Sequence, residues 1–432
     1  MVVTIVVLLI LAGVTISLLL DENGIIKKSK DARREYGTSK TNEQEQMDNA
    51  NDWIEEATAE PTPKVNVNTK AGENSTINGK KGNSNNPTIP AGYIPINTET
   101  SNWGNGKDAP SQDSVKHGLV IKDEKNNAWV WVPVPDVTVM CDTSNTTEYT
   151  LCGTTGDTAV TTNKYSKSGI ISGKTRITPG TTSDFREPDL VVGSGTEYDA
   201  SDTSSDTYYK TILGKTGTKE QLAQLFADEY KAMIESVSKY GGFYIGRYEL
   251  SSEGVQKDKA TLTNTNWYDL YQKCKILNAS NKVEARMIWG CQWDVACNFI
   301  ANKGDKKSIT DSSSWGNYKG TSVKADDGTT EIKASGTLAK LNTGKTTFTM
   351  ANNIYDLAGN VWEWTQEANN TYNRASRGGV YYNGGSNFPA SSRNIDSNGI
   401  GGNVNIRFSS HFNNKVILDT RAWAPVWRII AK

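Results

Sequence analysis

The stretch "NNIYDLAGNVWEWTQE", residues 352–367, carries the strongest fold signal in this chain. Gly359 can adopt a positive φ or lie close to a neighbouring backbone. Trp362 and Trp364 alternate with Glu363, which predicts a strand that buries both indoles on one side and turns the carboxylate to the other. The motif therefore has the pattern of a tightly specified scaffold.

A chemically quiet segment follows this motif, "RGGVYYNGGSNFPASSRN", residues 377–394. It contains no obvious acid, base or nucleophile, and its glycines bracket tyrosines and asparagines. Gly378 and Gly379 again permit positive φ or close backbone approach. A specified scaffold followed by exposed-looking, unreactive side chains suggests recognition rather than catalysis.

Outward from this block, the pattern predicts an α+β domain with short strands, few helices and long loops. Residues 117–136 predict a hairpin with its turn at Asp123–Asn127, and "FYIGRYEL" predicts a further strand. A helix is predicted from the capping residue Thr218 to the stop at Gly241, because an apolar stripe lies between them. Further helices are predicted at Trp267–Leu277 and around Trp289–Ala301, and residues 302–350 are predicted to be mostly loop.

Five blocks occur in order along the chain: "WVWVPV", "GGFYIGRYEL", "MIWGCQWDVAC", "NNIYDLAGNVWEWTQE" and "SRGGVYY". Together they resemble the formylglycine-generating (sulfatase-modifying factor) family, whose fold is a variant of the C-type lectin fold. The resemblance covers roughly residues 118–432, and it implies a C-type-lectin-like domain over residues 93–432. Val426–Ile430 would be its closing strand.

The resemblance implies a calcium ion held by Asn360, the Val361 carbonyl and Glu363, and oxygen ligands suit this cation. The alternative is that Asn360 caps a turn and Glu363 pairs with an arginine such as Arg377. Both interpretations are compatible with the sequence.

Catalytic members of the family use a pair of cysteines shortly after the "RGG" strand, and this chain has no cysteine after Cys297. Thiolate or copper chemistry would need such groups. With only 2 histidines and no other recognisable catalytic motif, we expect a non-catalytic protein. A formylglycine-generating-enzyme-like oxidoreductase that uses other residues is the alternative.

A non-catalytic branch with these features is formed by the variable proteins of diversity-generating retroelements. There, "RGG" opens a variable segment, and residues 377–410 here have the composition that such diversification produces. An ordinary Asn/Gly/Ser loop is the alternative. The resemblance makes Trp362, Trp364, Gly378 and Gly379 scaffold. The predicted ligand contacts are Tyr381, Tyr382, Asn383, Asn387, Phe388, Asn394, Ile395 and Asp396.

Residues 1–20 carry no charge and would form about 30 Å of helix, enough to cross a bilayer. Residues 1–57 resemble the N-terminal helix of type IV pilin-like proteins, which implies a membrane or pilus anchor with the domain facing outward. A cleaved signal peptide and a plain anchor are alternatives. The basic cluster Lys27–Arg34 would favour a cytoplasmic location for the rest of the chain, against this orientation. Residues 58–92 are poor in large apolar residues and predict a flexible linker.

Net charge bears on the class of partner, and cysteine positions bear on possible disulfides. The net charge of −1 gives no reason to expect nucleic acid as a partner. Cys141 and Cys152 could close a disulfide if the chain is exported, whereas Cys274, Cys291 and Cys297 are predicted to be buried thiols.

The sequence therefore predicts a cell-surface, adhesin-type protein that binds an unknown protein or glycan ligand. A structural minor pilin is the alternative.

Overall fold

A computed structural model of the chain describes residues 62–106, 110–137, 140, 148–151, 163–166, 171–172, 174–178, 181–184, 219–263, 265, 267–277, 283–368, 373–397, 412–413 and 416–419. The chain divides into two units, Met1–Glu60 and Pro61–Lys432. The predicted anchor and the Cys141–Cys152 pair lie outside the described residues, as does the closing strand predicted at Val426–Ile430. Among the described helices, none is both long enough and apolar enough to span a membrane.

The largest sheet of the described residues has the strand order β1-β2-β3-β9-β19-β10, and each neighbouring pair is antiparallel. Its strands are β1 (Ile94–Ile96), β2 (Val120–Lys122), β3 (Ala128–Pro133), β9 (Gly242–Gly246), β10 (Glu284–Met287) and β19 (Val416–Asp419). The predicted hairpin is β2–β3, and its turn is closed by the Asp123 carboxylate, which accepts the backbone N–H of Asn127 at 2.8 Å. This part of the prediction is confirmed.

A second sheet, with the order β17-β16-β15-β18, carries the motif and the segment after it. Its strands are β15 (Trp362–Ala368), β16 (Asn373–Arg377), β17 (Arg393–Ser397) and β18 (Phe412–Asn413). β15, β16 and β17 pair antiparallel, and β18 pairs parallel with β15. The predicted strand at Trp362–Trp364 is confirmed, and Glu363 within it is buried like the two indoles. The whole run 361–366 is buried, because α8 and β10 both contact β15.

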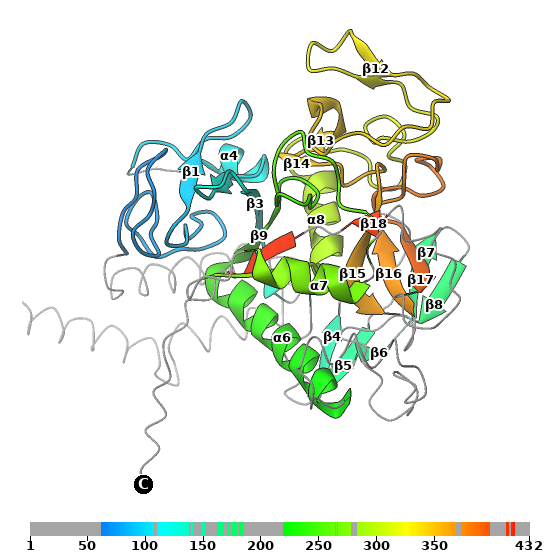
Figure 1. The fold of residues 1–432 in the computed structure, drawn as a ribbon. Coiled ribbons are helices and arrows are strands. Elements are labelled where there is room, and N and C mark those ends of the chain that lie inside the picture. The colour runs from blue at the N-terminus through cyan, green and yellow to red at the C-terminus, as the bar shows by residue number, and fades with distance from the viewer. Residues whose placement is uncertain are drawn as a thin grey trace, which may run out of the picture. The chain divides into compact units, whose positions relative to one another are not determined.

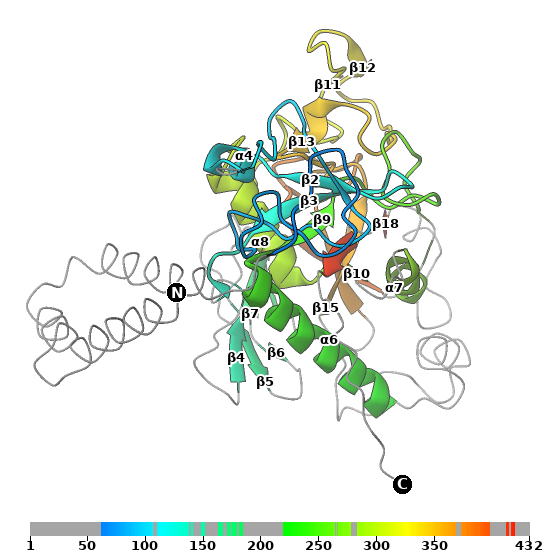
Figure 2. The same ribbon diagram turned by 90° about the vertical axis from the view of Figure 1, so that its left-hand side faces the viewer.

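Four α-helices are described: α4 (Gln112–Lys116), α6 (Lys219–Tyr240), α7 (Trp267–Ile276) and α8 (Gly290–Asn302). The last three confirm the helices predicted from the sequence. α8 lies between the two sheets and contacts both β3 and β15 (Figures 1 and 2). Because it is enclosed, α8 is buried on nearly every side, as expected of a helix at the centre of a domain. Cys274, Cys291 and Cys297 are buried thiols, as predicted.

The remaining elements are short. β11 (Val323–Lys324) pairs with β12 (Glu331–Lys333), β13 (Met350–Ala351) pairs with β14 (Ile354–Tyr355), and a 3-10 turn η2 spans Thr347–Thr349. The predicted loop region 302–350 therefore contains little regular structure. Of five more strands the structure describes only the backbone: β4 (Glu148–Leu151), β5 (Asn163–Ser166), β6 (Ile171–Ser172), β7 (Lys174–Thr178) and β8 (Thr181–Asp184).

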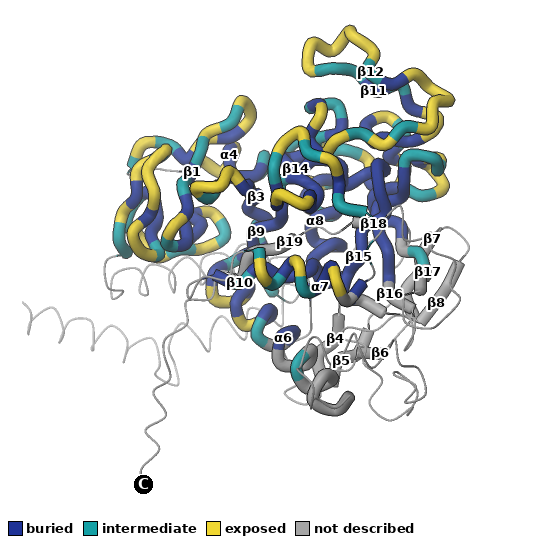
Figure 3. Tube along the Cα trace, viewed as in Figure 1, coloured by how far each residue is buried: buried dark blue, intermediate teal, exposed yellow. Residues whose placement is uncertain are grey.

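The predicted flexible linker is wrong over residues 62–92, which fold onto the domain. Val65, Ile77 and Ile89 are buried in the common core, while the outer turns of this segment are exposed (Figure 3). The indole of Trp131 donates to the Ser84 carbonyl at 2.9 Å, which ties the segment to β3. A few well-spaced apolar residues are sufficient here, because asparagine and threonine side chains satisfy the backbone of the turns.

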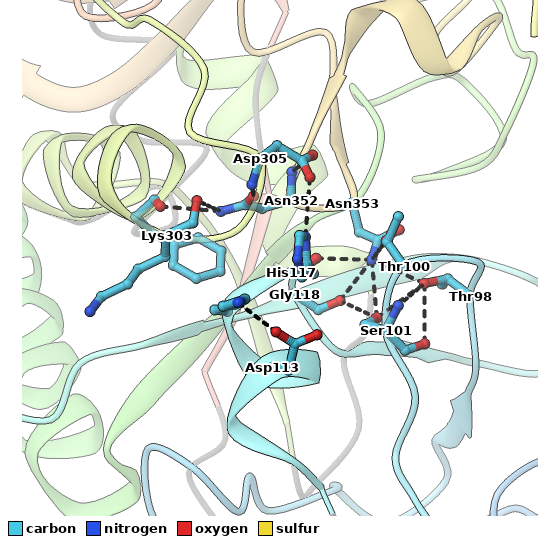
Figure 4. A network of polar contacts seen from close by, with 12 residues as sticks. Thr98, Thr100, Ser101, Asp113, His117, Gly118, Lys303, Asp305, Asn352 and Asn353 are labelled. Carbon is cyan, nitrogen blue, oxygen red and sulfur yellow. Dashed lines mark hydrogen bonds and ion pairs between the residues drawn. The ribbon is translucent and has the colours of Figure 1, made fainter.

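The first two residues of the motif, Asn352 and Asn353, hold three distant segments together (Figure 4). Asn353 Nδ2 lies 3.1 Å from Ser101 Oγ and 2.9 Å from the Gly118 carbonyl. Asn352 exchanges hydrogen bonds with Asp305: its backbone N–H donates to the carboxylate, and its Oδ1 accepts the Asp305 N–H, each at 2.8 Å. Both asparagines have positive φ, a conformation that asparagine tolerates better than most residues.

Candidate functional site

The candidate site is the segment Gly378–Ser392, here called the recognition loop, which connects β16 to β17. Two consecutive glycines begin it, with φ of 86° at Gly378 and 80° at Gly379. A Cβ on Gly379 would lie 2.4 Å from the Phe388 carbonyl oxygen, so only glycine fits there without distortion. The "GG" pair therefore turns the chain sharply out of the sheet.

The base of the recognition loop is held by a buried arginine. Arg377 is fully buried, and its guanidinium lies 2.5 Å from the Asp294 carboxylate on α8. The same side chain donates from Nε to the Ser392 carbonyl at 2.8 Å. One guanidinium thus joins the start of the recognition loop, its end and the central helix.

The segment 308–319 supports the recognition loop from the side. Tyr318 donates its hydroxyl hydrogen to the Gly378 carbonyl at 2.8 Å. Burial raises the pKa of Tyr318 well above its usual value, so the hydroxyl stays protonated and able to donate. Ser312 N–H donates to the Gly385 carbonyl at 3.0 Å, and Lys319 N–H donates to the Asn383 carbonyl at 3.0 Å. These contacts fix the backbone of the recognition loop at several points.

The motif and helix α8 also contact the recognition loop. The Asn360 carbonyl accepts the Tyr381 N–H at 3.1 Å, and the Trp293 indole donates to the Ala390 carbonyl at 2.9 Å. The Phe388 ring packs edge-on against Trp362, with centroids 5.6 Å apart. A backbone restrained in this way presents its outward side chains with little conformational freedom left to lose on binding.

The predicted contact residues fall into two groups. Five of them lie within the recognition loop: Asn387 is exposed, and Tyr381, Tyr382, Asn383 and Phe388 are half-buried. The rings of Tyr381 and Tyr382 stand edge to face, with centroids 5.3 Å apart. The structure therefore brings these five residues into one segment.

The other predicted contacts, Asn394, Ile395 and Asp396, lie in β17 instead of in a loop. There they pair with Ser376, Ala375 and Arg374 of β16, respectively. Asn394 is half-buried, and the side chains of Ile395 and Asp396 lie outside what the structure describes. That these three residues contact a ligand stays a prediction.

The two asparagines of the recognition loop keep their side-chain amides unused. Among the described residues, no hydrogen-bond partner contacts the side chain of either Asn383 or Asn387. Their backbones are engaged nonetheless: Asn383 N–H donates to Val380 at 2.8 Å, and Asn387 N–H donates to Gly384 at 3.2 Å. The exposed Asn387 amide is thus held on a fixed backbone and left available for an outside partner, whereas Asn383 is half-buried and its Oδ1 is covered without a hydrogen-bond partner.

The predicted calcium ligands Asn360, Val361 and Glu363 are all buried, and the calcium site stays a prediction. Asn360 Oδ1 accepts hydrogen bonds from Asn317 Nδ2 and from Leu341 N–H, each at 2.9 Å, which uses both of its lone pairs. Its Nδ2 donates to the buried carboxylate of Glu249 at 2.7 Å. A cation at Oδ1 would have to displace two donors. Among the described residues, no group of three or more His, Cys, Asp or Glu side chains forms a metal site.

Sequence reasoning missed three parts of this site. Ser386 is exposed beside Asn387, and the supporting segment 308–319 lies in a region without apolar periodicity. Asp294, the partner of Arg377, lies 83 residues away from it. Only its place on a buried helix could have indicated its role.

Known proteins offer few matches to this chain. No family model matches it, and no curated protein matches it. Among solved structures it is similar to Treponema denticola variable protein 1, at 18% sequence identity and a TM-score of 0.24. The alignment covers 37% of this chain and 71% of that chain, and a likeness at this score assigns neither fold nor function.

Proposed function

We propose that this chain is a non-catalytic ligand-binding protein whose binding face is the recognition loop. The observation that carries the proposal is the difference between the backbone and the side-chain amides within Gly378–Ser392. Its backbone is hydrogen-bonded to residues 312–319, Asn360 and Arg377, whereas the Asn383 and Asn387 amides make no hydrogen bond with described residues. A rigid backbone with unused polar groups and half-buried aromatic rings is the arrangement that antibody-type binding surfaces use.

Charge sets the kind of contact such a face can make. The recognition loop contains no Asp, Glu, Lys, Arg or His. Its side chains offer aromatic area through Tyr381 and Tyr382 and amide hydrogen bonds through Asn383 and Asn387. A protein surface or a glycan could satisfy both, and affinity should depend little on salt because few charges are neutralised on binding.

The proposal also covers the domain that carries this face and its location in the cell. We place it on a C-type-lectin-like domain that is anchored to a membrane or pilus by residues 1–57 and displayed outward, with residues 377–410 as the diversified segment. These points rest on the resemblances of the sequence, and calcium is not needed for the face as described.

The proposal is tested by removing the outward groups while keeping the backbone. The triple variant Tyr381→Ser, Tyr382→Ser, Asn387→Ser should lose binding to ligands found for the wild-type protein on a glycan array and in a displayed peptide library. Ile276→Ser is the matched control, since Ile276 is 70% exposed on α7, outside the recognition loop. Equal binding by the triple variant and the control would reject the proposed face.

A further inference from the structure

We propose that Asn383 is a site of spontaneous deamidation, which converts an amide at the centre of the recognition loop into a carboxylate. The side chain of an asparagine followed by glycine is open to attack by the glycine nitrogen, because glycine has no Cβ to block the approach. The chain has five Asn–Gly pairs, and three lie in described residues: Asn78–Gly79, Asn105–Gly106 and Asn383–Gly384. Their hydrogen bonds and exposure differ, and these differences predict different rates of deamidation.

In the pair Asn383–Gly384 the glycine side is open to this reaction, and the half-buried Asn383 has its Oδ1 covered but not hydrogen-bonded. Gly384 is exposed, and a Cβ built on it would meet only Asn387 Nδ2, at 4.0 Å. Among the described residues, no acceptor binds the Gly384 N–H, and no donor or acceptor holds the Asn383 side chain. Neither reacting group has to break a hydrogen bond with the protein before they meet.

The hydrogen bond between Lys319 N–H and the Asn383 carbonyl assists the same step. That carbonyl belongs to the peptide group whose nitrogen is Gly384 N, and the bond length is 3.0 Å. A donor on the carbonyl oxygen polarises the peptide group and favours loss of its N–H proton. The contact that fixes the loop backbone therefore also activates the nucleophile.

The step balances with water as the only co-reactant. Gly384 N gives its proton to solvent and bonds to Asn383 Cγ, the Cγ–Nδ2 bond breaks, and ammonia leaves after taking up a proton. Water then opens the resulting five-membered imide at either carbonyl. The products are aspartate at position 383 or an isoaspartyl linkage, which adds one methylene to the main chain. No atom is oxidised or reduced.

The pair Asn78–Gly79 has the same sequence but is locked. Asn78 Oδ1 accepts hydrogen bonds from Lys80 N–H at 3.0 Å and from Asn86 Nδ2 at 2.9 Å. Gly79 N–H donates to Thr76 Oγ1 at 3.1 Å. Both reacting groups are already bound, so this pair should persist in the folded protein.

The pair Asn105–Gly106 provides the opposite reference. Asn105 is exposed, nothing lies within 4 Å of a Cβ built on Gly106, and neither residue makes a side-chain contact with described residues. It should convert as readily as an unstructured Asn–Gly pair. One protein thus contains an open reference, a locked reference and the site in question.

Conversion at position 383 would change the chemistry of the recognition loop. It introduces a negative charge into a segment with no charged residue. The Asn383 N–H donates to the Val380 carbonyl, and the Asn383 carbonyl accepts the Lys319 N–H. An isoaspartyl linkage would also lengthen the main chain between these two groups. The consequence for ligand binding rests on the proposed function, whereas the modification itself does not.

The test is incubation of the purified full-length protein at mildly alkaline pH, with peptide mass spectrometry of the three pairs over time. We expect conversion at Asn383 to keep pace with Asn105 while Asn78 stays unchanged, and all three to convert alike in denaturant. Gly384→Ala, which fits the available space, should slow conversion at Asn383 alone. Asn383 remaining unchanged beside a converting Asn105 would overturn the proposal, whatever the outcome for ligand binding.

Discussion

Two segments of this protein have similar compositions and opposite structures: residues 62–92 and the recognition loop, 378–392. Both are rich in Asn and Gly. In residues 62–92 the amides turn inward: Asn86 is buried, and its Nδ2 donates to Asn78 at 2.9 Å and to the Lys81 carbonyl at 3.2 Å. In the recognition loop, the Asn383 and Asn387 side chains make no such contacts with described residues.

The difference shows that the groups which hydrogen-bond a loop's backbone decide whether its own polar side chains are needed for that purpose. Trp131 and Tyr244 donate to carbonyls of residues 62–92, but the turns of this segment are closed by its own asparagines and threonines. The backbone of the recognition loop is held from outside, by residues 312–319, Asn360 and Arg377. The Asn383 and Asn387 side chains are thereby not required to hydrogen-bond the backbone of the loop.

The largest expected effect is at the base of the recognition loop. Arg377→Met removes the partner of Asp294 and leaves a buried carboxylate without its 2.5 Å ion pair. Such losses cost about 3–5 kcal/mol. Denaturant unfolding should show a loss of this size, and the double variant Arg377→Met, Asp294→Leu should recover part of it. A loss below about 1 kcal/mol would contradict the supporting role of Arg377.

The next effect separates two glycines within the recognition loop. Gly379→Ala forces a positive φ on a residue with a Cβ and creates a clash with the Phe388 carbonyl, which should cost about 1–3 kcal/mol or more. Gly384→Ala is the matched control, because it meets open space and should change stability by less than about 0.5 kcal/mol. Thermal unfolding of both variants checks this difference, and equal losses would show that the loop backbone is not fixed as described.

A smaller effect compares one asparagine from each segment. Asn86→Ala should cost about 1–3 kcal/mol, because Asn78 and the Lys81 carbonyl lose a buried donor. Asn387→Ala should change stability by less than about 0.5 kcal/mol. Urea unfolding midpoints would reveal the difference, and the comparison fails if Asn387→Ala is the more damaging change.

The smallest effect concerns calcium. Because both lone pairs of Asn360 Oδ1 already accept hydrogen bonds, we expect chelation of calcium to leave the melting temperature unchanged. Calorimetry with and without a calcium chelator checks this. A melting temperature that rises with added calcium would show that Asn317 and Leu341 yield to the ion, and it would support the site predicted at Asn360, Val361 and Glu363.

Local elements could be predicted from the sequence wherever periodicity and capping agreed. The hairpin β2–β3 and the helices α6, α7 and α8 follow from apolar spacing and from turn residues such as Asp123. The position of the recognition loop could also be predicted, because "RGG" ends a strand and its glycines permit the turn out of the sheet. The lectin-like fold class and the anchor at residues 1–57 stay predictions.

Long-range support could not be predicted. Composition alone made residues 62–92 a linker, since nothing in the sequence shows that Trp131 donates to Ser84 or that Asn86 is buried. Composition also gave no sign of the contacts of residues 312–319 with the recognition loop, because these contacts join irregular segments about 70 residues apart. It also hid the pairing of Asn394, Ile395 and Asp396 with β16 in a strand.

The central claim is that the recognition loop has a fixed backbone and exchangeable side chains. Two displayed libraries test it most directly, scored by the fraction of members that resist proteolysis. One randomises Tyr381, Tyr382, Asn383, Ser386 and Asn387, and the other randomises Thr76, Asn78, Asn83, Asn86 and Thr88. We predict that most members of the first library stay folded while the second largely unfolds. Equal folded fractions in the two libraries would contradict the claim.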